Sequence, residues 1–144
     1  MLGLPIKSVV EPRKLVVAAP HTSVGEAARL MKEGKVGALL VVEEGVLIGI
    51  FTERDAVFRV MAGGLDPDST LLRDVMTPDP TTVAPDETFG YALLVMHENG
   101  FRHVPVVENG RPVGVVSARH ALDPDLEEFT AEAERRKAIR RRAA

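Results

Sequence analysis

An internal repeat with a period of 65 residues governs the fold of this chain. When the sequence is shifted by 65 positions, no gap is needed anywhere between Ala19 and Asp55. The shift keeps prolines, methionines and turn glycines in phase: Pro20 falls on Pro85, Met31 on Met96, Gly45 on Gly110, and Gly49 on Gly114. Such a repeat is a supersecondary unit that buries its apolar face against its neighbour. A length of 144 residues fits one compact domain or two small halves that share a core.

Both repeats predict a strand, an amphipathic helix, a hairpin and a second helix. In the first repeat these are Leu15–Ala18, Ser23–Glu33, Ala38–Val42 with Val46–Phe51, and Thr52–Met61. In the second they are Thr81–Ala84, Thr88–His97, His103–Val107 with Pro112–Val116, and a short helix that Asp123-Pro124 ends. The hairpin turns, Glu43-Glu44-Gly45 and Glu108-Asn109-Gly110, each supply the glycine that a tight turn needs.

The helix signals set the boundaries. Ser23 is typical of an N-cap, Glu26 stands where it would complete a capping box, and Gly34 lies where a C-terminal glycine is expected. The chain then divides into residues 1–64 (first repeat), 65–70 (linker), 71–122 (second repeat) and 123–144 (a charged helix). In the last segment acids come early and bases late, which suits the helix dipole.

Each repeat ends in the same motif, an apolar run followed by a hydroxyl residue and a polar residue three positions later. It reads Gly49-Ile50-Phe51-Thr52-Glu53-Arg54-Asp55 in the first repeat and Gly114-Val115-Val116-Ser117-Ala118-Arg119-His120 in the second. Thr52 and Asp55 have two compatible interpretations. They are a capping box, or they are a ligand site in which the helix N–H groups hold a phosphate and the carboxylate accepts two ribose hydroxyls.

The pattern as a whole resembles the cystathionine β-synthase (CBS) domain pair, also called a Bateman module. Besides the repeated end motif, the phrases Asp74-Val75-Met76-Thr77-Pro78 and Phe101-Arg102-His103-Val104-Pro105-Val106-Val107 are typical of that family. The resemblance covers Ile6 to about Leu122. It implies an α+β fold in which two β-α-β-β-α units pack with pseudo-two-fold symmetry. It also implies a stand-alone regulatory module, not an enzyme, that binds adenine nucleotides or related adenosyl ligands between its repeats and commonly forms a flat homodimer.

The resemblance also implies which residues bind the ligand. Thr52 would contact the sugar-phosphate and Asp55 the ribose, while Arg102, His103 and Arg119 would face the phosphates. The adenine would lie among apolar and backbone groups of Ala38, Ile50, Thr82 and Val83. Spacing alone leaves a second interpretation open, in which the basic residues are solvated strand ends and the apolar residues belong to the core.

The second repeat departs from the family pattern. Ser117 keeps the hydroxyl, but His120 replaces the carboxylate, and an imidazole cannot accept two ribose hydroxyls. We therefore expect one good site organised by Asp55 and a second site at Ser117 and His120 that is weak, altered or empty. Otherwise His120 is a surface residue at a helix start.

Composition narrows the class of function. A net charge of −3 does not favour nucleic acid, and 4% aromatic residues without tryptophan offer no stacking platform. The absence of cysteine fits a reducing compartment, and no apolar run suits a signal peptide or a membrane span, so we expect a cytoplasmic protein with no membrane partner. We find no spacing that predicts a metal site, a catalytic triad, a Walker loop or a catalytic cofactor.

The leading hypothesis is a non-catalytic sensor of AMP, ADP or ATP that regulates an unidentified partner. The alternatives are a ligand-free structural module, a binder of S-adenosylmethionine or NAD, and a nucleic-acid-associated regulator. The last would act through the basic tail, Arg135-Arg136-Lys137 and Arg140-Arg141-Arg142. That tail is also interpretable as a solvated helix, or as one that packs across a dimer through Leu126 and Phe129.

Overall fold

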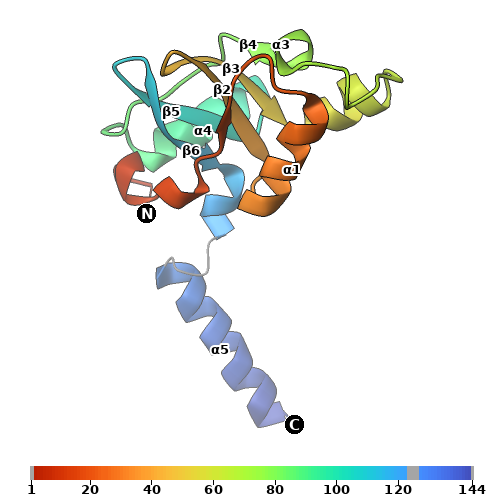
Figure 1. The fold of residues 1–144 in the computed structure, drawn as a ribbon. Helices are drawn as coiled ribbons and strands as arrows, with labels where there is room; N and C mark the ends of the chain where they lie inside the picture. Colours follow the sequence, from red (N-terminus) through yellow and green to blue (C-terminus); the bar gives the residue numbers. More distant parts are fainter. Residues whose placement is uncertain (1, 123–126, 144) are drawn as a thin grey trace.

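Two halves of the same design lie side by side in the computed structural model, which describes residues 2–122 and 127–143 (Figure 1). The first half holds two 3-10 turns, η1 (Ile6–Ser8) and η2 (Pro12–Lys14), then β1 (Val17–Ala18), α1 (Val24–Gly34), β2 (Ala38–Glu43), β3 (Val46–Thr52), α2 (Glu53–Asp55) and η3 (Ala56–Met61). The second holds α3 (Leu72–Val75), β4 (Thr77–Pro78), α4 (Phe89–Asn99), β5 (His103–Glu108), β6 (Arg111–Ser117) and η4 (Ala118–Leu122), and α5 (Glu127–Ala143) follows. The predicted α+β fold with two related units is confirmed.

The two hairpins are close copies of each other. Both turns have two residues at positive φ, Glu44 (52°) with Gly45 (79°) and Asn109 (54°) with Gly110 (78°). Such turns match the right-handed twist of the strands they join. Both hairpins also shift register at the same place, between Val41 and Val42 in β2 and between Val106 and Val107 in β5. The equivalence that the repeat predicts therefore extends to the backbone.

The first strands of the repeats are shorter than predicted. Of Leu15–Ala18, only Val17 and Ala18 form β1, which pairs with β2 in parallel. Of Thr81–Ala84, only Val83 forms a bridge, to Val106. Prolines flank this segment at positions 80 and 85, and because proline lacks an N–H it cannot extend the ladder in either direction.

The sequence did not predict strand β4, which crosses from one half to the other. The four-stranded sheet has the order β1-β2-β3-β4, and the second sheet contains β5 and β6. Gly49 and Ile50 in β3 pair with Pro78 and Thr77 in β4. The start of the second repeat therefore completes the sheet of the first.

The helix starts follow their caps, with one correction. The hydroxyl of Ser23 accepts a hydrogen bond from the N–H of Glu26 at 3.2 Å, as predicted. The predicted capping box at this helix is wrong, because the Glu26 carboxylate pairs with Arg29 at 3.1 Å instead of returning to Ser23. The helix predicted from Thr52 to Met61 changes after Asp55 from α to π geometry. The short helix predicted after Ser117 is a 3-10 helix, η4.

Gly34 has a different role from the one predicted. It remains helical, and the next residue, Lys35, takes the left-handed conformation that ends α1 (φ 54°, ψ 48°). A Cβ at position 34 would lie 2.7 Å from Cγ2 of Val16. Glycine at position 34 therefore allows close packing against Val16, just before β1. The left-handed backbone position that ends the helix is occupied by Lys35.

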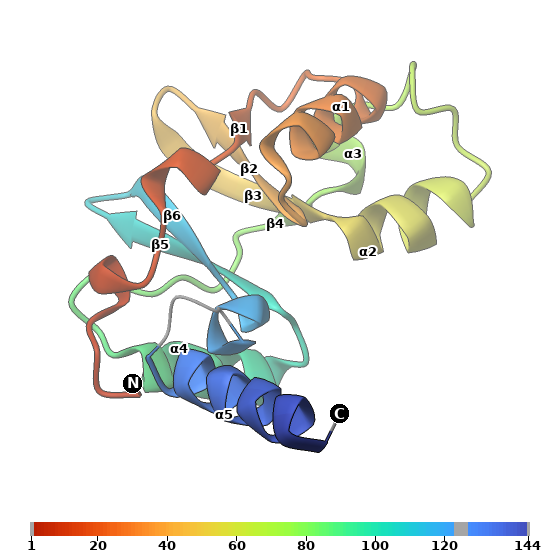
Figure 2. The ribbon, with the colours of Figure 1, turned by 90° about the horizontal axis from the view of Figure 1, so that it is seen from below.

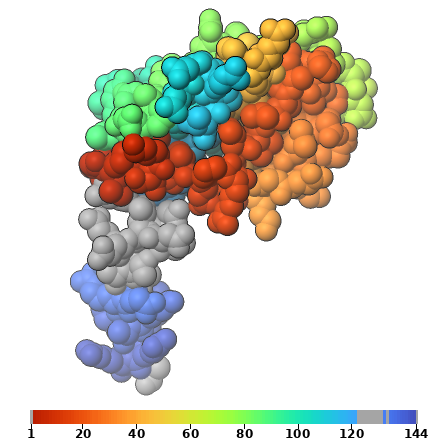
Figure 3. Space-filling model, turned by 60° about the vertical axis from the view of Figure 1, so that its left-hand side comes forward, coloured from red at the N-terminus to blue at the C-terminus, as the bar shows by residue number. Residues whose placement is uncertain are grey.

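The halves exchange their leading segments. Ile6 is fully buried in the core of the second half together with Phe89. Conversely, Leu72 is fully buried in the core of the first half together with Phe51. The space-filling view shows the N-terminal segment, in red, running along the surface from the second half to the first (Figure 3). Neither half completes its core without a segment of the other.

A smaller apolar cluster joins the halves between these two cores. Ala38, Leu40 and Ile50 from β2 and β3 are buried, and Val115 of β6 packs against them. The N–H of Leu47 also donates to the carbonyl of Gly110 at 3.1 Å, which ties one hairpin to the other. The view from below shows the hairpins next to each other between the helices (Figure 2).

The charged helix predicted for the C-terminal segment is present as α5. Its side chains form pairs along one face, such as Arg136 with Glu132 at 2.8 Å, and Ile139 is 60% exposed. The predicted contacts of Leu126 and Phe129 across a dimer lie outside what the structure describes. In the described ranges, no helix has both the length and the apolar character required to cross a bilayer.

Candidate ligand-binding site

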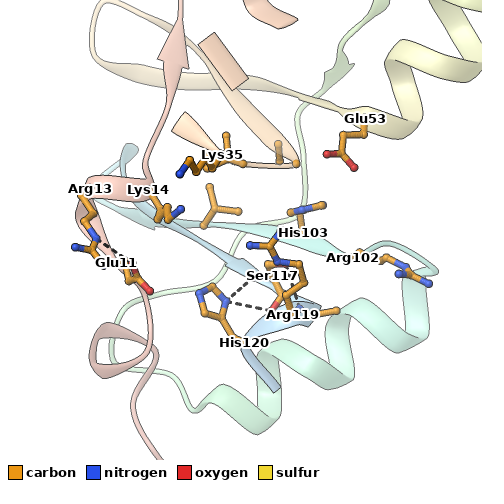
Figure 4. A pocket seen from close by; sticks show the side chains of 15 residues that line it. Glu11, Arg13, Lys14, Lys35, Glu53, Arg102, His103, Ser117, Arg119 and His120 are labelled. Carbon is orange, nitrogen blue, oxygen red and sulfur yellow. Dashed lines mark hydrogen bonds and ion pairs between the residues drawn. The ribbon is translucent and has the colours of Figure 1, made fainter. Parts of the chain in front are cut away.

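A cavity of about 930 Å³ opens where the two halves meet (Figure 4). Its walls come from η2, from the connection between α1 and β2, from the start of β5 and from the end of β6. Each of these segments ends or begins a regular element beside the central hairpins. The cavity therefore owes its shape to both repeats.

The cavity brings together residues that we predicted for two different sites. Its lining includes Ala38, Arg102, His103 and Arg119 from the first predicted site, and Ser117 and His120 from the second. The other five residues of the first predicted site are not among the described residues that line it. Thr82 is exposed elsewhere, Val83 (2% exposed) lies in the core of the second half, Ile50 (7%) lies between the halves, and Asp55 is discussed with Thr52 below.

Thr52 and Asp55 form the complete capping box at the start of α2. One carboxylate oxygen of Asp55, Oδ2, accepts from the Thr52 N–H at 3.0 Å and from the Thr52 hydroxyl at 3.2 Å. The other oxygen lies 3.5 Å from Nε of Arg59, and Asp55 is 8% exposed. Both oxygens are thus engaged inside the first half. Their roles in ribose and phosphate binding stay predictions.

His120 caps the helix start of the second repeat, as Asp55 caps that of the first. The N–H of Ser117 donates to Nδ1 of His120 at 2.9 Å, which matches the bond from Thr52 to Asp55. The hydroxyl of Ser117 accepts from the N–H of Arg119 at 3.2 Å. The imidazole therefore replaces the carboxylate as the cap, so this position adds no carboxylate to the cavity wall.

Four cations that line the cavity have no ion-pair partner among the described residues. Lys14, Lys35, Arg102 and Arg119 form no ion pair with any residue that the structure describes. Arg13, which also lines it, pairs with Glu11 at 3.1 Å. Glu11 and Glu53 also line the cavity, so five cations face two carboxylates there, and this positive balance suits an anionic ligand.

Sequence analysis missed Lys14 and Lys35. A signal for both was present, because neither has a basic counterpart in the other repeat. Lys35 corresponds to Gly100 at the shift of 65. Upstream of the first strand the shift is 66, because the first repeat carries one extra residue, and the stretch equivalent to η2 is Pro78-Asp79-Pro80. A charge that only one repeat carries is not needed for the shared fold. No group of three His, Asp or Glu side chains suited to a metal occurs in the part of the chain with described coordinates.

His103 is the titratable group most affected by the cavity. Burial lowers the pKa of His103 below its usual value, the carboxylate of Glu53 opposes this, and Arg119, His120 and Arg102 lower the pKa further. The small size of Gly37 admits the ring, because a Cβ there would lie 3.1 Å from Nε2 of His103. His103 is therefore neutral at pH 7, and it can gain a proton when an anion enters.

This lowered pKa predicts that acid destabilises the protein through His103. In the unfolded chain the imidazole takes up a proton near pH 6.5, and in the folded protein only at a lower pH. Stability should therefore fall as the pH drops from about 6.5 through the lower, folded-state pKa. Well above pH 6.5, His103 should make no pH-dependent contribution to stability. We expect the melting temperature of His103→Gln to fall less than that of the wild type between pH 7.5 and 5.5. Equal losses in the two proteins would refute the role of His103.

Comparison with known proteins identifies the family. Residues 6–62 and 72–125 match the sequence model of the CBS domain, one match for each repeat. The chain belongs to the CBS domain family. Its uncharacterized relative MK0525 from Methanopyrus kandleri is 34% identical over 115 residues, which are 78% of this chain. The chain spans 59% of the length of that relative, so the CBS pair makes up only part of it.

Solved CBS structures share the arrangement of the two halves. An uncharacterized conserved protein from Pyrococcus horikoshii superposes with a TM-score of 0.78 and 34% identity, over 85% of this chain and 92% of that one. The CBS domain pair of protein MJ0100 superposes with a TM-score of 0.74 and 25% identity, over 82% and 96% of the two chains. That structure is a complex with 5′-methylthioadenosine and S-adenosyl-L-methionine.

Proposed function

We propose that this CBS domain pair is a non-catalytic regulatory module that binds an adenine nucleotide in the cavity between its repeats. The observation that carries the proposal is the combination of an apolar wall with four cations that form no ion pair within residues 2–122 and 127–143. The apolar wall consists of Val36, Ala38, Val115 and Ala118. A flat aromatic base suits that wall, and phosphate oxygens suit the cations.

The ligands of MJ0100 support an adenosine-containing ligand. Both 5′-methylthioadenosine and S-adenosyl-L-methionine carry adenosine, and they bind a CBS pair that shares this fold. A second candidate for this chain is therefore an adenosyl ligand without phosphates. The electrostatics of the cavity favour a nucleotide, since the sulfonium of S-adenosylmethionine is itself a cation and would meet Arg102, Arg119 and Lys35.

A cytoplasmic homodimer is part of the same proposal. Large apolar side chains are exposed on the helical surfaces of both halves: Val57, Phe58 and Met61 in the first, and Tyr91 and Leu94 in the second. Exposed apolar patches of this kind mark protein interfaces. Ligand binding between the repeats would change how the two halves present these surfaces to the other subunit or to a regulated partner.

The decisive test compares two arginines at equivalent positions of the repeats. Arg119 lines the cavity, whereas the guanidinium of Arg54 lies 5.0 Å from the ring centroid of Phe58. We expect calorimetry to show binding of an adenine nucleotide by the wild type. Arg119→Ala should weaken it by about tenfold or more, through the loss of a charge-assisted hydrogen bond. Arg54→Ala should leave it unchanged.

Two results would contradict the proposal. Absence of binding for ATP, ADP and AMP together would remove the nucleotide function. If S-adenosylmethionine or 5′-methylthioadenosine then bound, the second candidate would take its place. Equal weakening by both arginine variants would show that the ligand does not occupy this cavity.

A further inference from the structure

The cations of the cavity are distributed against the symmetry of the repeat. Arg102 and Arg119 come from the second half, and Lys14 and Lys35 come from the first. The equivalent positions hold Pro78-Asp79-Pro80 in place of η2 and Gly100 in place of Lys35. The region related to the cavity by the repeat therefore lacks these two lysines and instead contains Asp79. One site of the module has become cationic while its counterpart has not.

The four cations come from both halves and are spread around the cavity. Figure 4 shows Lys14 and Lys35 on the side of the first half, Arg119 near the centre, and Arg102 at the right with its guanidinium directed away from the others. A cavity of about 930 Å³ is of the size that holds a drug-sized ligand, such as a nucleotide with its phosphates. A single phosphate has only three terminal oxygens and occupies one place, whereas a chain of phosphates extends across the cavity and meets cations from both halves.

Lys35 occupies a backbone position that disfavours it. Its φ of 54° is in the left-handed region, where a side chain other than that of Asn, Asp or Gly is strained. The equivalent residue of the second repeat is Gly100, with a φ of 71°. Its N–H caps the helix as that of Lys35 does. Glycine would suit this backbone position better, and strained backbone positions cluster at functional sites.

We propose that the cavity selects adenine nucleotides with two or three phosphates over AMP and over adenosyl ligands without phosphates, and that Lys35 is a specificity-determining residue for the outer phosphates. This inference rests on the proposed function and names its ligand class. The residues of the second half, Arg102 and Arg119, hold the phosphate nearest the ribose. The lysines of the first half, Lys14 and Lys35, hold those further out.

The test replaces Lys35 by glycine and measures stability and affinity together. Lys35→Gly relieves the strained backbone, so the melting temperature without ligand should stay the same or rise by about 2–4 °C. We expect the affinity for ATP and ADP, measured by calorimetry in magnesium-free buffer, to fall by about tenfold. The affinity for AMP should change by less than twofold. Wild-type protein should bind ATP at least about tenfold more tightly than AMP, with one nucleotide per chain.

Asn109→Gly is the matched control. Asn109 also has a positive φ, 54°, but it lies in the β5–β6 turn and is not a lining residue of the cavity. Its replacement also places glycine at a positive φ but removes no cation, so all nucleotide affinities should stay unchanged. A loss of ATP affinity in Lys35→Gly but not in Asn109→Gly, with no loss of stability in Lys35→Gly, is the result that the proposal requires.

Each contrary result has its own meaning. Wild-type protein that binds AMP as tightly as ATP would overturn the selection for longer phosphate chains and leave the nucleotide function intact. Equal loss of AMP and ATP affinity in Lys35→Gly would overturn the assignment of Lys35 to the outer phosphates. Wild-type protein that binds none of the three nucleotides would fail the proposed function itself.

Discussion

Replacing Ile6 by alanine is expected to lower the free energy of unfolding by about 2–5 kcal/mol, although the residue lies near the N-terminus. Ile6 is fully buried in the core of the second half, where it packs with Phe89, and its N–H donates to the carbonyl of Glu87 at 2.8 Å. The substitution leaves a cavity in a core that belongs to the other repeat. Denaturant unfolding measures the loss, and hydrogen exchange locates it in α4 and β5.

The neighbouring Lys7→Ala is the control for this prediction. Lys7 pairs with Asp86 at 2.8 Å, and both side chains are exposed, so its removal should hardly change the unfolding midpoint. A loss of protection confined to the first half in Ile6→Ala would contradict the exchange of leading segments. So would a stability equal to that of the wild type.

The elements that the sequence predicted well are those set by local signals. The hairpins follow from the glycines at 45 and 110, and the helix starts follow from the hydroxyls of Ser23, Thr52 and Thr88. These signals act within four residues, so one sequence carries all the information they need. The same signals occur in both repeats, which strengthens the prediction of each element.

What the sequence did not reveal depends on contacts between distant segments. No local pattern shows that Thr77 pairs with Ile50. Nor does one show that Ile6 is buried in the core of the second half and Leu72 in the core of the first. Strand β4 has two residues, which is too short for an apolar period, and its pairing is set by the sheet edge that the first half leaves open. Such pairings are fixed by tertiary packing.

The candidate site was predicted in part for the same reason. Arg102, His103 and Arg119 were found because they follow a family pattern, and they do line one cavity. The sequence could not show which of the two related clefts these residues line, because the end motifs of the two repeats have the same spacing. Lys35 was missed because a helix end predicts glycine there, and only comparison with Gly100 exposes the substitution.

Asp55→Ala is expected to separate the two interpretations of the first motif. The substitution leaves the half-buried Thr52 N–H without its acceptor and removes the partner of Arg59, so stability should fall by about 1–3 kcal/mol. Because both Asp55 oxygens are engaged within the first half, nucleotide affinity should change by less than twofold. Calorimetry well below the melting temperature of the variant keeps the two effects apart.

The variant at the equivalent position of the second repeat, His120→Ala, should instead weaken nucleotide binding. His120 caps the same turn of the second repeat through the N–H of Ser117, but it also lines the cavity. Its loss should therefore weaken nucleotide binding more than Asp55→Ala does. If instead a folded Asp55→Ala protein loses more than tenfold in affinity while His120→Ala does not, the ribose lies at Asp55. The ligand would then occupy the less cationic of the two related sites, and hydrogen bonds to the carboxylate, more than phosphate contacts, would govern its binding.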